Sequence, residues 1–169
     1  MRKPFSQRGN IILEASLLIP LIVLLLVGMS QIAKITYTYF TLRKTVYSVA
    51  TYLSSRQGVN FCDAGDPTVT EAITFGLTGT TDNSQPVFVT GLTPDMIQVS
   101  ALRFDPVAQT VGQCSCSITG CDLAAGGTAP DYITVSIPNG YQIPVRIPML
   151  PTMDPILLKP TVKVPYGGT

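Results

Sequence analysis

One stretch decides the fold of this 169-residue chain: Arg8-Gly9-Asn10-Ile11-Ile12-Leu13-Glu14-Ala15-Ser16-Leu17-Leu18-Ile19-Pro20, which an apolar run continues to Gly28. Between Ile11 and Ala33 the only charged residue is Glu14. As a helix, residues 11–33 would extend about 35 Å at ~1.5 Å per residue, enough to cross a hydrocarbon core of about 30 Å. The sequence therefore predicts a membrane helix near the N-terminus.

Glu14 and Pro20 are unusual residues for such a helix. On insertion scales an aspartate at the centre of a membrane helix costs about 2.5–3.5 kcal/mol, and less near the interface, so Glu14 is a candidate functional residue. Alternatively, its carboxylate reaches the cytoplasmic interface beside Arg8 and has no further role. Pro20 removes one backbone hydrogen bond and is expected to kink or loosen the helix, which neighbouring groups in a membrane can offset.

The spacing of three residues carries a family resemblance. Gly9, Glu14 five positions later and Pro20 six beyond that resemble the class III signal of type IV pilin-like proteins. The TadE-like pseudopilins of the tight-adherence (Tad/Flp) pilus system are the closer match, because Asn10 is not aromatic and Ala15 is not the tyrosine common in Flp major pilins. The resemblance implies that a prepilin peptidase cuts between Gly9 and Asn10, and that Glu14 helps to place the subunit in the assembly.

The same resemblance implies a minor pilin that acts by assembly. Its partners would be other pilin or pseudopilin subunits in a homo- or hetero-oligomer, the prepilin peptidase, the pilus assembly platform proteins and membrane lipid. If cleavage frees the amine of Asn10, pairing at ~4 Å with a Glu14 carboxylate is worth roughly 4 kcal/mol at an effective dielectric of about 20, before desolvation. Two alternatives stay open: a major filament-forming subunit, and a single-pass envelope adhesin or receptor domain whose leader stays attached.

Charge is distributed unevenly along the chain, although its net charge is only +1. Residues 1–57 hold seven of the eleven Lys and Arg but one of the ten acidic residues. Because Arg2, Lys3 and Arg8 precede the apolar run, the positive-inside rule places the N-terminus in the cytoplasm and the rest on the other side of the membrane. The resemblance to TadE-like proteins implies that this membrane is the bacterial inner membrane and that the exported part lies in the periplasm. The acidic remainder does not resemble a nucleic-acid binder. With no histidine in the chain, we expect no enzyme, no cofactor and no His-ligated metal.

Beyond the membrane run, apolar residues repeat every seven positions from Ile32 to Leu53, which predicts one helix from about Asn10 to about Arg56, ended at Gly58. This stripe either packs on its own domain or also contacts neighbouring helices. The predicted organisation is a leader at 1–9, a long helix at 10–57 with its membrane part at about 11–33, and an exported domain at 58–169. The fold class is α+β, a long N-terminal transmembrane helix followed by a small antiparallel β-rich domain with disulfides.

Within 58–169, Asp66-Pro67 predicts a helix start, with a capping box over 68–71 and an end near Gly76. Strands are expected at 96–104, at 131–137 and at 156–164, where Pro160 and Pro165 indicate an edge or an interruption. Prolines at five positions favour an extended, polyproline-like segment over 138–155. The alternating strand, this linker and the closing strand also resemble the C-terminal part of TadE-like domains.

Four cysteines lie in the predicted exported part, at Cys62, Cys114, Cys116 and Cys121. An even number in an oxidising compartment predicts two disulfides, with three possible connectivities. A bridge from Cys114 to Cys116 would strain a very small ring, so we expect Cys62 to pair with one of these two and Cys121 with the other. The usual spacing of structural zinc ligands is absent, so no metal site is predicted.

Overall fold

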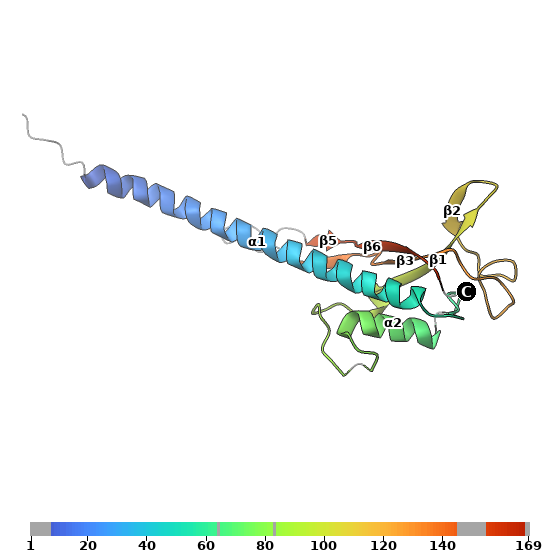
Figure 1. Cartoon of the computed structure of the whole chain (residues 1–169). Helices are drawn as coiled ribbons and strands as arrows, with labels where there is room; N and C mark the ends of the chain where they lie inside the picture. Colours follow the sequence, from blue (N-terminus) through green and yellow to red (C-terminus); the bar gives the residue numbers. More distant parts are fainter. Residues whose placement is uncertain (1–7, 64, 83, 145–154, 168–169) are drawn as a thin grey trace, which may run out of the picture.

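The computed structural model describes residues 8–63, 65–82, 84–144 and 155–167, without the side chains of 8–13. Its dominant element is α1 (Arg8–Ser54), a 47-residue helix that runs through Pro20 as one continuous element (Figure 1). The predicted long helix is thus confirmed, with its end two residues before the expected Arg56. Most of the expected leader, residues 1–7, lies outside the described residues.

The remaining elements form a small antiparallel domain around the C-terminal half of α1 (Figure 1). A four-stranded sheet has the order β2-β1-β3-β6, and a two-stranded sheet pairs β4 with β5. The α+β class, with a long apolar N-terminal helix and a disulfide-containing β domain, agrees with the sequence. The elements are α2 (Pro67–Thr78), a 3-10 turn η1 (Pro94–Met96), β1 (Gln98–Asp105), β2 (Thr110–Gln113), β3 (Tyr132–Ser136), β4 (Tyr141–Ile143), β5 (Ile156–Leu158) and β6 (Thr161–Pro165).

The C-terminal half of α1 lies between the sheet and α2 and forms the centre of the hydrophobic core (Figure 1). α1 packs against β3 and β6 on one side and against α2 on the other, and its buried residues begin at Leu42. We call the part of the chain from Leu42 to the C-terminus the head. In the seven-residue stripe, Leu42, Val46, Val49 and Leu53 are completely buried, whereas Ile32 is 65% exposed. The second half of the stripe therefore packs on its own domain, and the first half does not.

α2 starts where the sequence predicted, at Asp66-Pro67, but its capping and its end differ from the prediction. The Asp66 side chain caps the helix by accepting hydrogen bonds from the backbone N–H groups of Thr68 and Val69 at 2.7 and 3.4 Å. The predicted capping box is wrong, because Asp66 already satisfies these donors and Glu71 instead accepts a hydrogen bond from the Tyr52 hydroxyl. The predicted end at Gly76 is also wrong: the helix continues to Thr78 and is ended by Gly79 at a φ of 81°.

Gly76 is needed for close packing rather than for ending the helix. A Cβ at this position would overlap Cγ2 of Val49 and would lie 3.1 Å from the carbonyl oxygen of Thr45. Both contacts belong to α1, so the absence of a side chain at Gly76 lets the two helices approach each other. Glycine is required at position 76 by the packing of α2 against α1, which the local sequence does not reveal.

The strands follow the predictions in part. β3 matches the expected strand at 131–137, and β1 begins later than expected because Pro94–Met96 form a 3-10 turn. The expected strand at 156–164 divides before Thr161 into β5 and β6, which join different sheets, and β6 is an edge strand as its prolines indicated. β4 lies in the segment expected to be polyproline-like, of which 145–154 lie outside the described residues.

Candidate functional site

The N-terminal half of α1 extends from the head as a single helix (Figure 1). No residue from Glu14 to Thr41 is buried, and the large apolar side chains between Leu17 and Leu26 are 51–68% exposed. A contiguous apolar surface of this size marks a membrane or protein interaction site. By length and composition, α1 is a candidate membrane anchor, with none of its most apolar window buried.

An estimate of the insertion energy shows that the apolar residues outweigh Glu14. Nine large aliphatic residues lie between Leu17 and Leu26, and each contributes about −0.3 to −0.6 kcal/mol at a helix centre, or about −3 to −5 kcal/mol together. A carboxylate such as aspartate costs about 2.5–3.5 kcal/mol at the centre and less toward the ends. Because Glu14 lies before this run and therefore nearer the interface, the free energy of inserting its side chain is below that range. The segment is compatible with a bilayer despite its acid.

The motif residues all lie on the first turns of α1. Gly9 and Asn10 are in its first turn, and Glu14 follows four residues after Asn10 with an exposed side chain. Residues four apart share a helix face, so the backbone nitrogen of Asn10 and the Glu14 carboxylate lie on the same side. Pro20 comes six residues after Glu14, about 120° away around the helix at 3.6 residues per turn. Within the described residues, no hydrogen bond or ion pair engages Glu14.

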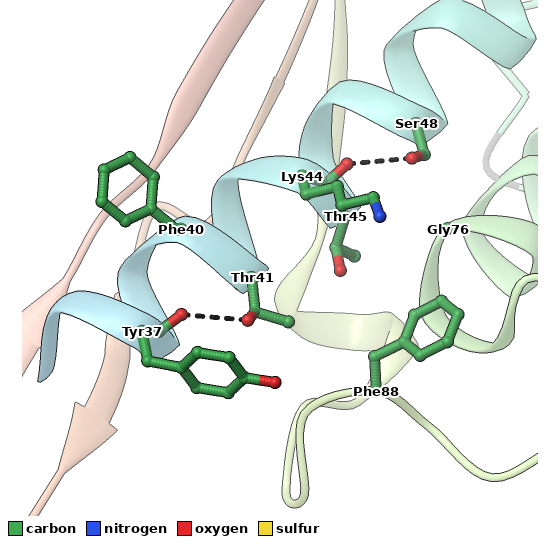
Figure 2. A pocket seen from close by; sticks show the side chains of 8 residues that line it. All are labelled: Tyr37, Phe40, Thr41, Lys44, Thr45, Ser48, Gly76 and Phe88. Carbon is green, nitrogen blue, oxygen red and sulfur yellow. Dashed lines mark hydrogen bonds between the residues drawn. The ribbon is translucent and has the colours of Figure 1, made fainter. Parts of the chain in front are cut away.

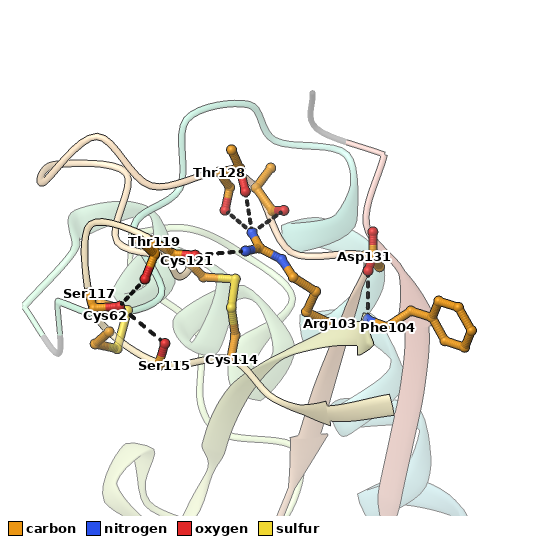
Figure 3. The surroundings of a disulfide bond; sticks show 12 residues. Cys62, Arg103, Phe104, Cys114, Ser115, Ser117, Thr119, Cys121, Thr128 and Asp131 are labelled. Atoms are coloured by element: carbon orange, nitrogen blue, oxygen red, sulfur yellow. Dashed lines mark hydrogen bonds between the residues drawn. A yellow bond between two sulfur atoms is a disulfide. The ribbon is translucent and has the colours of Figure 1, made fainter. Parts of the chain in front are cut away.

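The segments that hold the four cysteines, between α1 and α2 and between β2 and β3, lie at the end of the head away from the N-terminal half of α1 (Figure 1), and Figure 3 shows the disulfides themselves. Disulfides join Cys62 to Cys116 and Cys114 to Cys121, which is one of the two pairings that the sequence left open. The first bridge links the end of the α1 region to the loop after β2, 54 residues away. All four thiols are therefore used, and the described part of the chain holds no cluster of three or more potential metal ligands.

Arg103 organises the loops around the second disulfide (Figure 3). Its guanidinium donates hydrogen bonds to the carbonyl oxygens of Thr128 and Ala129 at 2.6 and 3.1 Å and to that of Thr119 at 3.4 Å. These carbonyls belong to loops that lie outside the sheet. The arginine thus has a structural role at this end of the head, a role that the sequence did not indicate.

Two perturbed groups stabilise the start of α2 and the chain end. Burial raises the pKa of Asp66, but hydrogen bonds from the backbone N–H groups of Asn60, Thr68 and Val69 outweigh it and hold that pKa below its ordinary value. Burial raises the pKa of the Tyr166 hydroxyl, which donates to the carbonyl oxygen of Arg56 at 2.8 Å. Asp66 thus stabilises the start of α2, and Tyr166 ties the chain just after β6 to the segment that follows α1.

Compared with protein-family models, curated proteins and solved structures, the chain matches none of them. The protein is therefore classified by its own structure. It is an elongated α+β protein in which one helix has an exposed apolar half, a candidate membrane anchor, and a second half that forms the core of a disulfide-bonded head.

Proposed function

We propose that this protein is a TadE-like minor pilin, or pseudopilin, which inserts into the bacterial inner membrane and takes part in the assembly of a Tad/Flp-type pilus. The observation that carries the proposal is the apolar half of α1, which extends from the head with no buried residue between Glu14 and Thr41 and carries Glu14 near its start. A helix of this kind needs lipid or other helices around it. In a pilin-like subunit it has both in turn: lipid before assembly and neighbouring subunits afterwards.

Cleavage between Gly9 and Asn10 gives Glu14 its role. The new amine of Asn10 is a cation on the same helix face as the Glu14 carboxylate, four residues away. At ~4 Å such a pair is worth roughly 4 kcal/mol at an effective dielectric of about 20, less the cost of desolvation. The amine pairs with Glu14 of its own subunit in the free state, or with Glu14 of a neighbour in the fibre. Exchange between these partners guides docking.

The head acts by contact and not by turnover. The chain has no histidine, and its four cysteines are joined in disulfides, as suits an exported domain. The partners of the whole protein are the prepilin peptidase, other pilin-like subunits and the assembly platform in the membrane. The head lies in the periplasm before assembly and on the cell surface afterwards.

Intact mass of the membrane-derived protein tests the first step. We expect a species that begins at Asn10 in cells with the prepilin peptidase, and the uncut chain in otherwise identical cells that lack it. A chain that keeps its leader in both strains would instead support the single-pass envelope domain, which needs the helix only as an anchor.

Variants of Glu14 test the second step. We expect Glu14→Gln and Glu14→Ala to reach wild-type levels in the membrane fraction but to be lost from sheared surface fibres, whereas Glu14→Asp keeps the charge and is partly incorporated. Loss of 1.4 kcal/mol in docking lowers the binding constant about tenfold, and quantitative immunoblots of fibre and membrane fractions measure the resulting loss of incorporation. Normal incorporation of Glu14→Gln would reject the assembly role. The copy number in purified fibres separates a minor from a major subunit.

A further inference from the structure

Two open hollows flank α1 just where it enters the head. One, of about 400 Å³, lies on the α2 side and is bordered by Tyr37, Phe40, Lys44 and Phe88 (Figure 2). The other, of about 620 Å³, lies between α1 and β6, and Phe40 and Lys44 border it as well. Because these two residues are one helical turn apart, they form the ridge that separates the hollows.

The larger hollow is strongly cationic. Arg43 and Lys44 from α1 and Lys163 from β6 line it, and we call these three residues the collar. Neither hollow has an Asp or Glu among its lining residues, and no ion pair or hydrogen bond engages the Arg43 or Lys44 side chain within the described residues. The Lys163 ammonium lies 4.2 Å from the centre of the Tyr132 ring. Three cations without a nearby acid favour an anionic ligand.

The place of the collar on α1 identifies the source of that anion. Arg43 comes ten residues after Ala33, about 15 Å along the helix at ~1.5 Å per residue. The headgroup layer extends about 5–8 Å beyond the hydrocarbon, which leaves roughly 7–10 Å. Helical side chains point toward the N-terminus, here toward the membrane, so the long side chains of Arg43 and Lys44 cover most of that gap. The remainder lies within a Debye length of about 8 Å.

Aromatic residues fill the interval between the apolar run and the collar. Tyr37 and Phe40 are 75% and 60% exposed, although both are large and neither faces the core. Tyrosine is enriched at the level of lipid headgroups, where its ring is apolar and its hydroxyl is wet. The order along α1 is therefore apolar run, aromatic residues and cations, which matches the order of layers in one leaflet of a bilayer.

We propose that the collar binds the phosphate groups of anionic glycerophospholipids in the leaflet next to the head, with Arg43 and Lys44 as the main ligands. This inference rests on the membrane insertion in the proposed function, but it does not depend on cleavage or on pilus assembly. Such contacts would hold the head close to the membrane until the subunit leaves it.

Native mass spectrometry of the full chain tests the collar. The protein is released from a mild detergent that contains equimolar phosphatidylglycerol and phosphatidylcholine, and the ratio of the two bound lipids is measured. We expect the wild type to prefer phosphatidylglycerol. Each basic residue near an anionic surface raises the affinity about fivefold. Loss of two such residues in Arg43→Gln/Lys44→Gln should therefore lower the preference for phosphatidylglycerol roughly tenfold to thirtyfold. The control, Arg56→Gln, removes an arginine thirteen residues further from the membrane and should keep the preference.

Three results would overturn the proposal that the collar binds anionic lipid. These are an unchanged preference in the double variant, an equal loss in Arg56→Gln, or displacement of the lipid by millimolar inorganic phosphate. The basic residues before the apolar run are intact in every variant, so they do not produce the difference. Both substituted side chains are exposed, so we expect the head of the double variant to stay folded, which its circular dichroism spectrum checks against the wild type. Extraction of the wild type from membranes by alkaline carbonate would instead reject the membrane insertion, and with it the proposed function.

Discussion

Replacing Gly76 with alanine would force α1 and α2 apart at their closest approach. The new methyl group would overlap Cγ2 of Val49 and lie 3.1 Å from the carbonyl oxygen of Thr45. Val49 is completely buried, and the Thr45 oxygen is part of the α1 backbone, so neither group can move aside without disturbing the core. The substitution tests whether this helix contact is as tight as the structure has it.

Two energies of opposite sign decide the result. Alanine is about 1 kcal/mol more favourable than glycine within a helix, which alone would stabilise α2. Overpacking a well-filled core costs typically about 1–3 kcal/mol. Because the overlap with Val49 is severe and the site is rigid, we expect Gly76→Ala to lower the free energy of unfolding by about 1–2 kcal/mol.

A double-mutant cycle with Val49→Ala isolates the overlap. That second substitution removes the overlapping methyl group and itself costs about 1.6 kcal/mol, at ~0.8 kcal/mol for each of two methyl groups. In the Val49→Ala background, Gly76→Ala should be neutral or stabilising by up to about 1 kcal/mol, which gives a coupling energy of about 1–3 kcal/mol. Urea unfolding of the full chain in mild detergent, with disulfides intact, can be followed by tyrosine fluorescence because the chain has seven tyrosines and no tryptophan. If Gly76→Ala stabilises the wild type, or costs the same in both backgrounds, the tight contact is refuted.

The helix cap and the disulfides give two further predictions. Asp66→Ala should cost at least about 1 kcal/mol, whereas Asp66→Asn keeps the oxygen that accepts from Thr68 and Val69 but loses the one that accepts from the Asn60 N–H, so it should retain only part of the stability near neutral pH. Because folding lowers the pKa of Asp66, its carboxylate stabilises the fold fully above its ordinary pKa and loses this effect as the pH falls through the pKa of the folded state. The free energy of unfolding, measured with urea, should therefore fall over that pH range by more in the wild type than in Asp66→Asn. Serine replacements at Cys62 and Cys116 should cost about 4.2 kcal/mol, and those at Cys114 and Cys121 about 2.4 kcal/mol, from loop-closure entropy over sequence separations of 54 and 7 residues. Equal costs in non-reducing urea unfolding would contradict the loop-length argument.

Sequence patterns predicted the elements whose structure depends mainly on neighbouring residues in the chain. The long helix followed from an uninterrupted apolar run and a seven-residue repeat, and β3 followed from alternation of β-branched residues. β2 was missed because all four of its residues, Thr110–Gln113, are exposed, and an exposed strand has no alternating burial to leave in the sequence. β4 was missed because it has three residues in a proline-rich segment and depends on pairing with the distant β5.

The candidate site could be predicted only where its residues are close in sequence. Gly9, Glu14 and Pro20 form a motif that can be read along the chain, and the structure adds that all three lie in α1, with Glu14 and Pro20 exposed. The collar could not be predicted, because Arg43 and Lys44 acquire a meaning only when β6 brings Lys163 beside them. That juxtaposition depends on the closing strand of the sheet, 119 residues further along the chain, and on the packing of the sheet against α1.

Since α1 is one continuous helix from Arg8 to Ser54, its exposed half and its core half share a single helical register. The angular phase of Glu14 relative to the sheet is fixed by the number of residues between Glu14 and Leu42. One inserted residue in that interval would turn the head by about 100°, and seven would return it to within about 20° of its starting direction. The number of helical residues between Glu14 and Leu42 thus sets the direction in which the outer surface of the head points relative to Glu14.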